Sequence, residues 1–201
     1  RLWIRPKRHS VGAKWLCRKP AQFVTLTVNL IWLTLNGVTR KENAMANPLN
    51  CQCSCGSTRF SITGSPLLRA YCHCNICQAF NQGPFADITL FHVRDVIKPA
   101  ESSVEFKSHK FPPLLKRGSC RTCGKAAIEY LNIPTMPEVV IVPSANIQDK
   151  TFIPKPSLHI FYDKRVADVQ DNLPKHTGYL KSEFALGHKV VMALLANNKN
   201  R

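Results

Sequence analysis

The hydrophobic pattern of this chain consists mostly of short apolar segments separated by Pro, Gly or Asn. In residues 58–62 apolar and polar positions alternate up to a turn signal at residues 64–66, as in a half-buried strand. Several segments of this length point to antiparallel sheets rather than to a helical bundle. We therefore predict a mainly β protein, with strands at residues 58–62, 85–91, 104–107, 126–131, 139–142 and 158–162.

The last part of the chain has a different period. Ser182 is an N-cap residue type, and it precedes residues 183–197, where apolar side chains recur every three or four positions. We predict a helix over residues 183–197 that begins after Ser182. The apolar face predicted for it consists of Phe184, Leu186, Val190, Val191 and Leu194.

Residues 1–44 differ from both patterns. A basic start precedes an apolar run at residues 23–35, which contains Thr and Asn and is too short and too polar to predict a membrane span. A signal peptide, an organelle transit peptide and an upstream extension before Met45 all fit this order of residues. We favour the extension and expect three parts: a leader at 1–44 outside the fold, a metal-binding domain at 45–178 and a helical tail at 179–201.

The charge distribution also separates the leader from the rest. The formal net charge is +16; residues 1–44 hold nine Lys or Arg and one acidic residue, and residues 45–201 hold nineteen and eleven. Each part thus contributes +8, although the second is more than three times as long. Because metal-bound thiolates would lower the charge of the second part further, that part suits an anionic small molecule at least as well as a nucleic acid.

Eight of the nine cysteines lie between Cys51 and Cys123, in three clusters. Cys-x-Cys and Cys-x-x-Cys spacings bring sulfurs to one side of a strand or turn, as metal ligands require, whereas neighbouring cysteines of this kind do not easily bridge each other. The spacing therefore favours metal thiolates over disulfides and predicts a reducing, cytoplasmic compartment, with organelle targeting by the leader as a second possibility. The clusters are Cys51, Cys53 and Cys55; Cys72, Cys74 and Cys77; and Cys120 and Cys123.

Together these clusters resemble the family of glutathione-dependent formaldehyde-activating enzymes and centromere protein V. The resemblance covers residues 51–175. The elements that carry it are Cys53, Cys55 and Gly56 with Arg59 and Phe60; Cys72, His73, Cys74 and Cys77; and Cys120, Cys123 and Gly124. Fainter similarities are residues 83–85, Arg117, His159 with Ile160, and residues 171–174.

The resemblance implies an Mss4-like fold, in which folded antiparallel sheets are pinned by two zinc sites. The structural site implied is a closed one made by Cys53, Cys55, Cys120 and Cys123. The catalytic site implied has three protein sulfurs, from Cys72, Cys74 and Cys77, and keeps its fourth position open. Glutathione would bind there as a thiolate and add to formaldehyde to give S-hydroxymethylglutathione. Arg59 and Arg117 are candidates to hold the glutathione carboxylates.

Three features lie outside this pattern. Cys51 is an additional cysteine: it is a bystander, exchanges with Cys55 in a shifted register, or closes the open position of the second site. His73, between two ligands, is expected to point away from their metal as a neutral side chain. The glycine that the family has soon after the second cluster is displaced, with Gln82 preceding Gly83, and Ser119 replaces the aromatic residue before the third cluster.

Two main functions compete on this basis. The first is a zinc-dependent carbon–sulfur lyase or synthase that acts on glutathione and an aldehyde, with no membrane or nucleic-acid partner. The second is a non-catalytic zinc module that contacts chromatin, cytoskeleton or another protein. A plain zinc ribbon is a third reading, but it leaves Cys72, Cys74 and Cys77 without a role.

Overall fold

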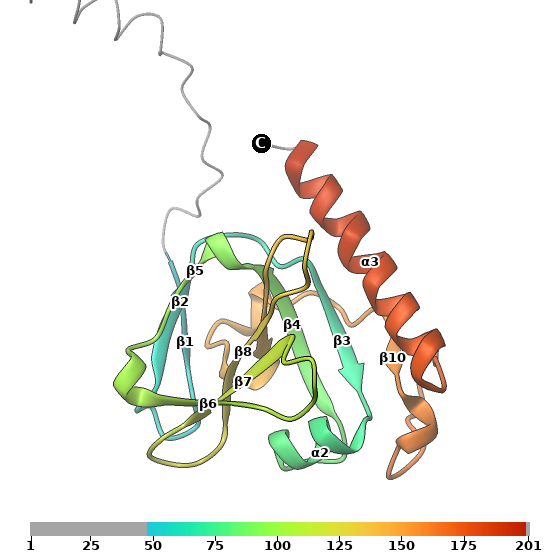
Figure 1. Cartoon of the computed structure of the whole chain (residues 1–201), viewed down its shortest axis with the longest axis horizontal. Helices are drawn as coiled ribbons and strands as arrows, with labels where there is room; N and C mark the ends of the chain where they lie inside the picture. Colours follow the sequence, from blue (N-terminus) through green and yellow to red (C-terminus); the bar gives the residue numbers. More distant parts are fainter. Residues whose placement is uncertain (1–47, 200–201) are drawn as a thin grey trace, which may run out of the picture. The chain divides into compact units, whose positions relative to one another are not determined.

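The computed structural model describes residues 48–199, and the predictions for the leader at 1–44 lie outside this part. The described chain contains two β-sheets and a C-terminal helix (Figure 1), so the prediction of a mainly β fold is confirmed. The smaller sheet has the strand order β1-β2-β5 and the larger one β10-β3-β4-β9-β8-β7-β6. The strand pairs are antiparallel except for β10, which runs parallel to β3.

The strands are β1 (Leu49–Gln52), β2 (Arg59–Ile62), β3 (Leu68–Cys72), β4 (Ala86–His92), β5 (Val96–Ile97), β6 (Val104–Ser108), β7 (Leu115–Cys120), β8 (Ala126–Leu131), β9 (Val139–Pro143) and β10 (His159–Ile160). The α-helices are α2 (Asn75–Asn81) and α3 (Tyr179–Lys199). Single 3-10 turns are η1 (Val93–Asp95), η2 (Glu101–Ser103), η3 (Ser144–Asn146), η4 (Lys150–Phe152) and η5 (Tyr162–Lys164).

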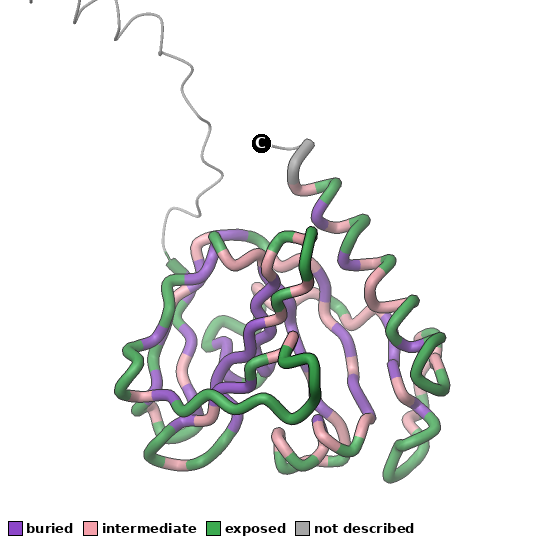
Figure 2. Tube along the Cα trace, in the orientation of Figure 1, coloured by how far each residue is buried: buried purple, intermediate pink, exposed green. Residues whose placement is uncertain are grey.

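Both faces of the larger sheet are covered, and this explains its continuous apolar strands. All five residues of β9 are buried; Val140 and Val142 join the cluster beside the smaller sheet, whereas Val139 and Ile141 join the cluster beneath α3. Alternate side chains of a strand point to opposite faces, so a strand covered on both sides is apolar throughout. Figure 2 shows this burial along the central strands and an exposed connection between β6 and β7.

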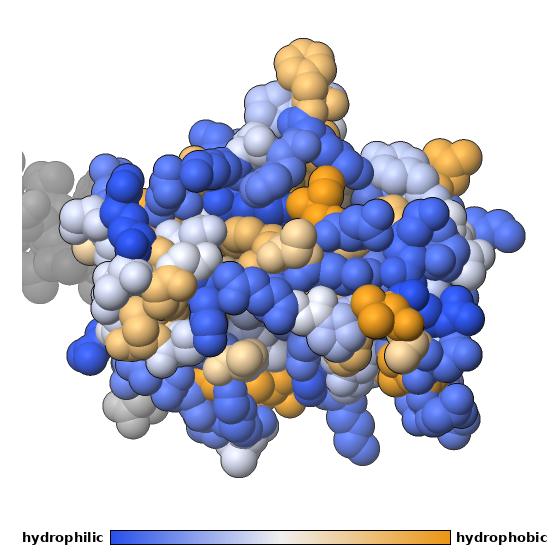
Figure 3. Space-filling view, turned by 90° about the horizontal axis from the view of Figure 1, so that it is seen from below, coloured by the Kyte–Doolittle hydropathy of each residue, from blue (hydrophilic) through white to orange (hydrophobic). Residues whose placement is uncertain are grey.

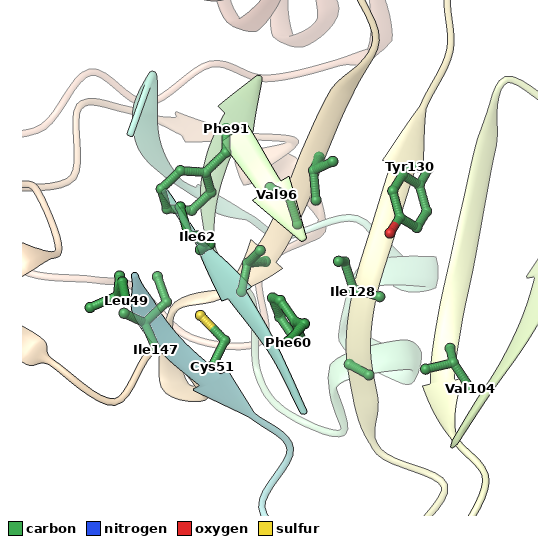
Figure 4. Close-up of a cluster of buried hydrophobic side chains, with 13 residues drawn as sticks. Leu49, Cys51, Phe60, Ile62, Phe91, Val96, Val104, Ile128, Tyr130 and Ile147 are labelled. Atoms are coloured by element: carbon green, nitrogen blue, oxygen red, sulfur yellow. The ribbon is translucent and has the colours of Figure 1, made fainter. Parts of the chain in front are cut away.

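Cys51 belongs to the cluster between the two sheets. Its side chain lies among Ile62, Ile147 and Phe60 (Figure 4), and only 1% of the residue is exposed. Burial raises the pKa of this thiol to about 12, and Lys150 opposes the shift only partly. Cys51 is therefore a neutral core residue, packed as a small apolar side chain.

The C-terminal helix differs from its prediction in two ways. It begins at Tyr179, so Ser182 lies one turn inside it and is not its N-cap. The buried Ser182 hydroxyl accepts a hydrogen bond from the Phe161 N–H at 2.8 Å and donates one to the His176 carbonyl at 3.2 Å. Phe184 and Val191, predicted on the apolar face, are exposed, because the sheet covers only the stripe that contains Val190 and Leu194.

Gly118 in β7 is closely packed. A Cβ atom there would lie 2.6 Å from the Phe106 ring, 2.7 Å from a Val104 methyl and 2.8 Å from the Ile128 carbonyl oxygen. We expect Gly118→Ala to destabilise the protein by about 2 kcal/mol, because overpacking here must shift backbone as well as side chains. Urea denaturation measures this loss.

Gly187→Ala is the matched control, since nothing lies within 4 Å of a Cβ at this helical position. It is expected to stabilise the protein by about 0.5–1 kcal/mol. Equal effects of the two substitutions would contradict the packing described for β7.

Candidate metal centres

Four cysteines from distant parts of the sequence meet at one place. Cys53 and Cys55 follow β1, and Cys120 ends β7, followed by Cys123. Their four sulfurs all lie within 4.8 Å of one another, with 3.3 Å between Cys53 and Cys55 and 3.7 Å between Cys55 and Cys120. Sulfurs at the corners of a zinc tetrahedron are about 3.8 Å apart, because each bond is about 2.3 Å long. This tetra-cysteine cluster therefore fits zinc.

Tight turns with glycine place these sulfurs. The Gly56 N–H donates to the Cys53 carbonyl at 2.9 Å, and the Gly124 N–H donates to the Cys120 carbonyl at 2.8 Å. Both glycines have a φ near +70°, at 73° and 70° respectively. Other residues rarely adopt this conformation, so each Cys-containing turn depends on the glycine that closes it.

Hydrogen bonds reach two sulfurs of the tetra-cysteine cluster. The Thr58 N–H donates to the Cys53 sulfur at 3.3 Å. Burial alone would raise the pKa of Cys120, but hydrogen bonds from the Thr58 side chain and from the Cys123 and Thr122 backbone lower it to about 5. A metal ligand must be deprotonated, so the surroundings of Cys120 favour its role as a ligand.

The second cluster is a cysteine triad. Cys72 ends β3, Cys74 caps α2 and Cys77 lies within that helix. Their sulfurs lie within 4.8 Å of one another, and the Cys77 N–H donates to the Cys74 sulfur at 3.4 Å. Within residues 48–199, no fourth His, Cys, Asp or Glu joins this group.

The three residues of the triad differ in exposure. Cys72 and Cys77 are buried, whereas Cys74 is partly exposed. Hydrogen bonds from Cys72 and Cys77 lower the pKa of Cys74 to about 2, and hydrogen bonds to the other two sulfurs, with burial, raise the pKa of Cys72 well above its usual range. Three sulfurs this close cannot all be charged without a cation between them, so the donor set fits zinc here too.

Helix α2 ends in an unusual conformation. Gln82 follows it with a φ of 53° and a ψ of 46°, in the left-handed region, and its N–H donates to the Ala79 and Gln78 carbonyls. This is the C-cap geometry in which glycine is the commonest residue. The sequence places Gly83 one residue later, so the left-handed position falls on a residue with a side chain.

A buried ion pair lies beside the triad. Arg117 of β7 faces Glu129 of β8 in the strand register, and the two side chains form a salt bridge. The other terminal nitrogen of Arg117 donates to the Cys77 sulfur at 3.7 Å. Burial raises the pKa of Glu129 to about 7, although Arg117 opposes the shift.

The two arginines predicted as substrate contacts differ in exposure. Arg117 is only 7% exposed, and its guanidinium lies over the Phe80 ring at 5.5 Å. Arg59 is exposed, and its Nε donates to the Gly56 carbonyl at 2.8 Å, next to the tetra-cysteine cluster. Only Arg117 therefore lies at the triad, and its described partners belong to the protein.

A hydrogen-bonded chain runs behind the triad. His73 lies between two triad cysteines, is buried, and contacts His159 through Nε2···Nδ1 at 2.9 Å. The other nitrogen of His159 contacts the Asp171 carboxylate at 2.8 Å, and Lys175 contacts the same carboxylate at 2.9 Å. Sequence reasoning noted His159 and Asp171 without assigning them a role, because only the fold brings them to His73.

The hydrogen bonds between His73, His159 and Asp171 determine which ring nitrogens carry a proton. The carboxylate only accepts, so His159 donates from Nε2 and, when neutral, accepts at Nδ1 from His73. Burial and then His159 lower the pKa of His73 to about 4, so that ring is neutral at pH 7. As expected from the sequence, His73 is a neutral side chain; its contacts lie with the segment that contains β10 and Asp171.

All eight cysteines in residues 48–199 are free of disulfide bonds, in agreement with the cysteine spacing, which favours metal ligands over disulfides. No helix in the described part of the chain is long and apolar enough to cross a membrane.

Comparisons with known proteins agree with this arrangement. The family model described as "Glutathione-dependent formaldehyde-activating enzyme" matches residues 48–164. The match covers more than half of the chain, so the chain belongs to the glutathione-dependent formaldehyde-activating enzyme family. It includes every cysteine of both clusters and ends before α3.

No curated protein sequence matches the chain. Among solved structures, a crystal structure of a Rhodobacter sphaeroides protein is similar, with 16% sequence identity and a TM-score of 0.41. The similarity covers 63% of this chain and 99% of that one. It is too low to support a statement about function.

The position of Cys51 leads to a prediction about metal content. Its side chain packs in the core, apart from both groups of clustered sulfurs. Cys51→Ala is therefore expected to leave the number of bound metal ions per chain unchanged, while it lowers the free energy of unfolding by about 1 kcal/mol through the lost packing. Metal analysis of the purified variant and urea denaturation measure the two effects.

Cys55→Ala is the control, because it removes a sulfur of the tetra-cysteine cluster. It is expected to lose metal at that cluster. A loss of metal from the Cys51 variant would show that the Cys51 thiol reaches one of the clusters.

The hydrogen-bonded chain behind the triad leads to a prediction about how thermal stability depends on pH. Partial burial alone would raise the pKa of Asp171, but hydrogen bonds from His159 and Lys175 lower it to about 2. A lowered carboxyl pKa stabilises the fold above its usual value, which is 3.8, and this contribution is lost as the pH falls towards 2. Asp171→Ala should therefore lower the Tm by a constant amount at about pH 5 to 8, and by less below about pH 4.

Asp168→Ala is the matched control. Asp168 pairs with Arg165 at an exposed position, where an ion pair contributes little, so a smaller loss of Tm is expected. A larger loss for Asp168→Ala than for Asp171→Ala would contradict the importance of the hydrogen-bonded chain behind the triad.

Proposed function

We propose that this protein is a zinc-dependent carbon–sulfur lyase or synthase that forms or cleaves S-hydroxymethylglutathione or a related thiol–aldehyde adduct. The observation that carries the proposal is the cysteine triad, whose three sulfurs meet without a fourth metal-binding side chain among the described residues. Three protein ligands with an open position are typical of catalytic zinc, whereas four are typical of structural zinc. Family membership supplies the substrate class.

The two clusters have different roles in this proposal. Cys53, Cys55, Cys120 and Cys123 would hold a structural zinc, and Cys72, Cys74 and Cys77 would hold the catalytic one. Zinc bound at the triad would lower the pKa of a coordinated substrate thiol. In the net reaction the thiol sulfur would form a bond to the aldehyde carbon as the second bond of the carbonyl group breaks, and the proton lost by the thiol would end on the former carbonyl oxygen. No electrons are lost, so the reaction needs no redox cofactor.

The triad residues determine access and orientation. Cys72 and Cys77 are buried, and Cys74 is partly exposed, so a substrate thiol would approach from the side of Cys74. The hydrogen-bonded chain behind His73 and the buried pair of Arg117 and Glu129 hold the turn that carries these sulfurs. Unbridged thiolates also favour a reducing compartment such as the cytoplasm.

A second candidate function is a non-catalytic interaction module. The observation that favours it is α3, which lies beyond the matched residues 48–164 and exposes Leu180, Phe184, Met192 and Leu195. The face on which α2 lies in Figure 1 is mostly hydrophilic, with small separate apolar patches (Figure 3). In this second candidate function, the exposed apolar side chains of α3 would therefore make the contacts with a partner.

The proposed activity is tested with the full chain, ¹³C-formaldehyde and glutathione. Two zinc ions per chain are expected, with exchange between formaldehyde and S-hydroxymethylglutathione faster than the uncatalysed rate. Exchange NMR measures this rate. Cys74→Ser should lower the rate at least about 100-fold and release one zinc, because it removes a ligand of the open site.

Cys51→Ala is the control, and it should keep both zinc ions and the activity. Two bound zinc ions with no thiol binding and no acceleration would contradict the enzyme and favour the interaction module. DNA binding that weakens steeply with salt would point instead to a nucleic-acid partner.

A further inference from the structure

Arg117 has a position that substrate binding does not explain. It lies on β7, three residues before Cys120 of the tetra-cysteine cluster, and only 7% of it is exposed. A buried guanidinium is costly unless its N–H groups have acceptors. The structure provides two of them, the Glu129 carboxylate and the Cys77 sulfur.

The geometry around the guanidinium is specific. One terminal nitrogen of Arg117 binds Glu129 and the other lies 3.7 Å from the Cys77 sulfur. One face of the group lies over the Phe80 ring at 5.5 Å. Glu129 is only 1% exposed and lies directly opposite on β8, so its carboxylate can orient the guanidinium towards the sulfur. The planar, forked arrangement of donors allows Arg to bridge two acceptors in this way, which Lys cannot reproduce.

We propose that Arg117 is a positioning residue of the triad: it donates a hydrogen bond to the Cys77 thiolate, and Glu129 holds it in that orientation. The inference rests on the proposed metal site. A hydrogen bond to a coordinating sulfur draws electron density away from it, and such partners of ligands tune the metal and its affinity. Arg117 thus acts through Cys77 and does not touch the substrate.

The effect on chemistry follows from charge. Three thiolates around a divalent cation leave a net charge of −1, which opposes the binding of a further thiolate. Arg117 pairs with the Glu129 carboxylate through one terminal nitrogen, and the N–H of the other points its positive end at the Cys77 sulfur, which offsets part of this charge in a region of low dielectric. A substrate thiolate is therefore easier to hold at the open position when Arg117 is present.

The test uses cobalt(II) as the probe in place of zinc, because its thiolate charge-transfer band reports the donor strength of each sulfur. Arg117→Gln should shift the band of the triad to longer wavelength, since a sulfur without its hydrogen bond is a stronger donor. Affinity of the triad for the metal should nevertheless fall about 10- to 100-fold, because Cys77 is no longer held in the orientation that a ligand needs. The band of the tetra-cysteine cluster is the internal reference and should not move.

Arg69→Gln is the matched control. Arg69 also forms a strand-to-strand ion pair, with Asp87 at 2.6 Å, but its described hydrogen-bond partners are oxygens rather than a cysteine sulfur. It should leave both cobalt bands and both affinities unchanged. If Arg117→Gln does not fold, Arg117→Lys keeps the buried charge and should shift the band in the same direction by a smaller amount.

The outcomes separate the two proposals. Two cobalt ions per chain with an unchanged triad band and affinity in the Arg117 variant would overturn the role of Arg117 and leave the proposed function intact. If the wild-type protein bound cobalt only at the tetra-cysteine cluster, the proposed function would fail, and the role of Arg117 with it. A shift in the Arg117 variant, absent in the Arg69 variant, supports the inference.

Discussion

The meeting of four sulfurs between two sheets is the constraint on which the rest of this structure depends. Cys53 and Cys55 follow a strand of the smaller sheet, and Cys120 ends a strand of the larger one, yet the Cys55 and Cys120 sulfurs are 3.7 Å apart across 65 residues of sequence. The apolar cluster behind them contains Cys51 and joins the same two sheets. A metal at this point would fix the relative position of both sheets and would contribute directly to folding.

Strand β7 connects this constraint to the triad. Cys120 fixes its end, and Arg117, on the same strand, reaches Cys77 in α2. On the opposite side, His73 is tied through His159 to Asp171, about one hundred residues further along the chain. The turn that carries the triad is therefore held from two sides by hydrogen-bonded polar groups, of which Arg117, Glu129, His73 and His159 are buried.

Much of the fold could be predicted from the sequence, because the relevant signals are local. Residues 126–131 form β8 with the bounds expected from their apolar pattern. Strand β7 was missed, because its buried positions include Arg117 and Gly118, which are polar or lack a side chain. Their burial depends on Glu129 in the neighbouring strand and on close packing against Phe106, and neither contact can be read from β7 alone.

The same difference between local signals and contacts of distant residues applies to the candidate site. Cysteine spacing identified the three clusters along the sequence, because the cysteines within each are close in sequence. The joining of Cys53 and Cys55 with Cys120 and Cys123 was implied by the family resemblance alone. The contacts of Arg117 and His73 could not be predicted, since each depends on a partner that the fold brings from elsewhere. The start of α3 was misplaced for a related reason: Ser182 has the residue type of a cap, but its hydroxyl bonds to residues outside the helix.

The left-handed backbone at Gln82 has a consequence for the evolution of this chain. A residue with a side chain in this region costs about 1 kcal/mol relative to glycine, and this one ends the helix that carries Cys77. A single substitution, Gln82→Gly, could recover that stability. One substitution at this position would thus raise the stability of the fold, and a more stable fold tolerates a wider range of later mutations.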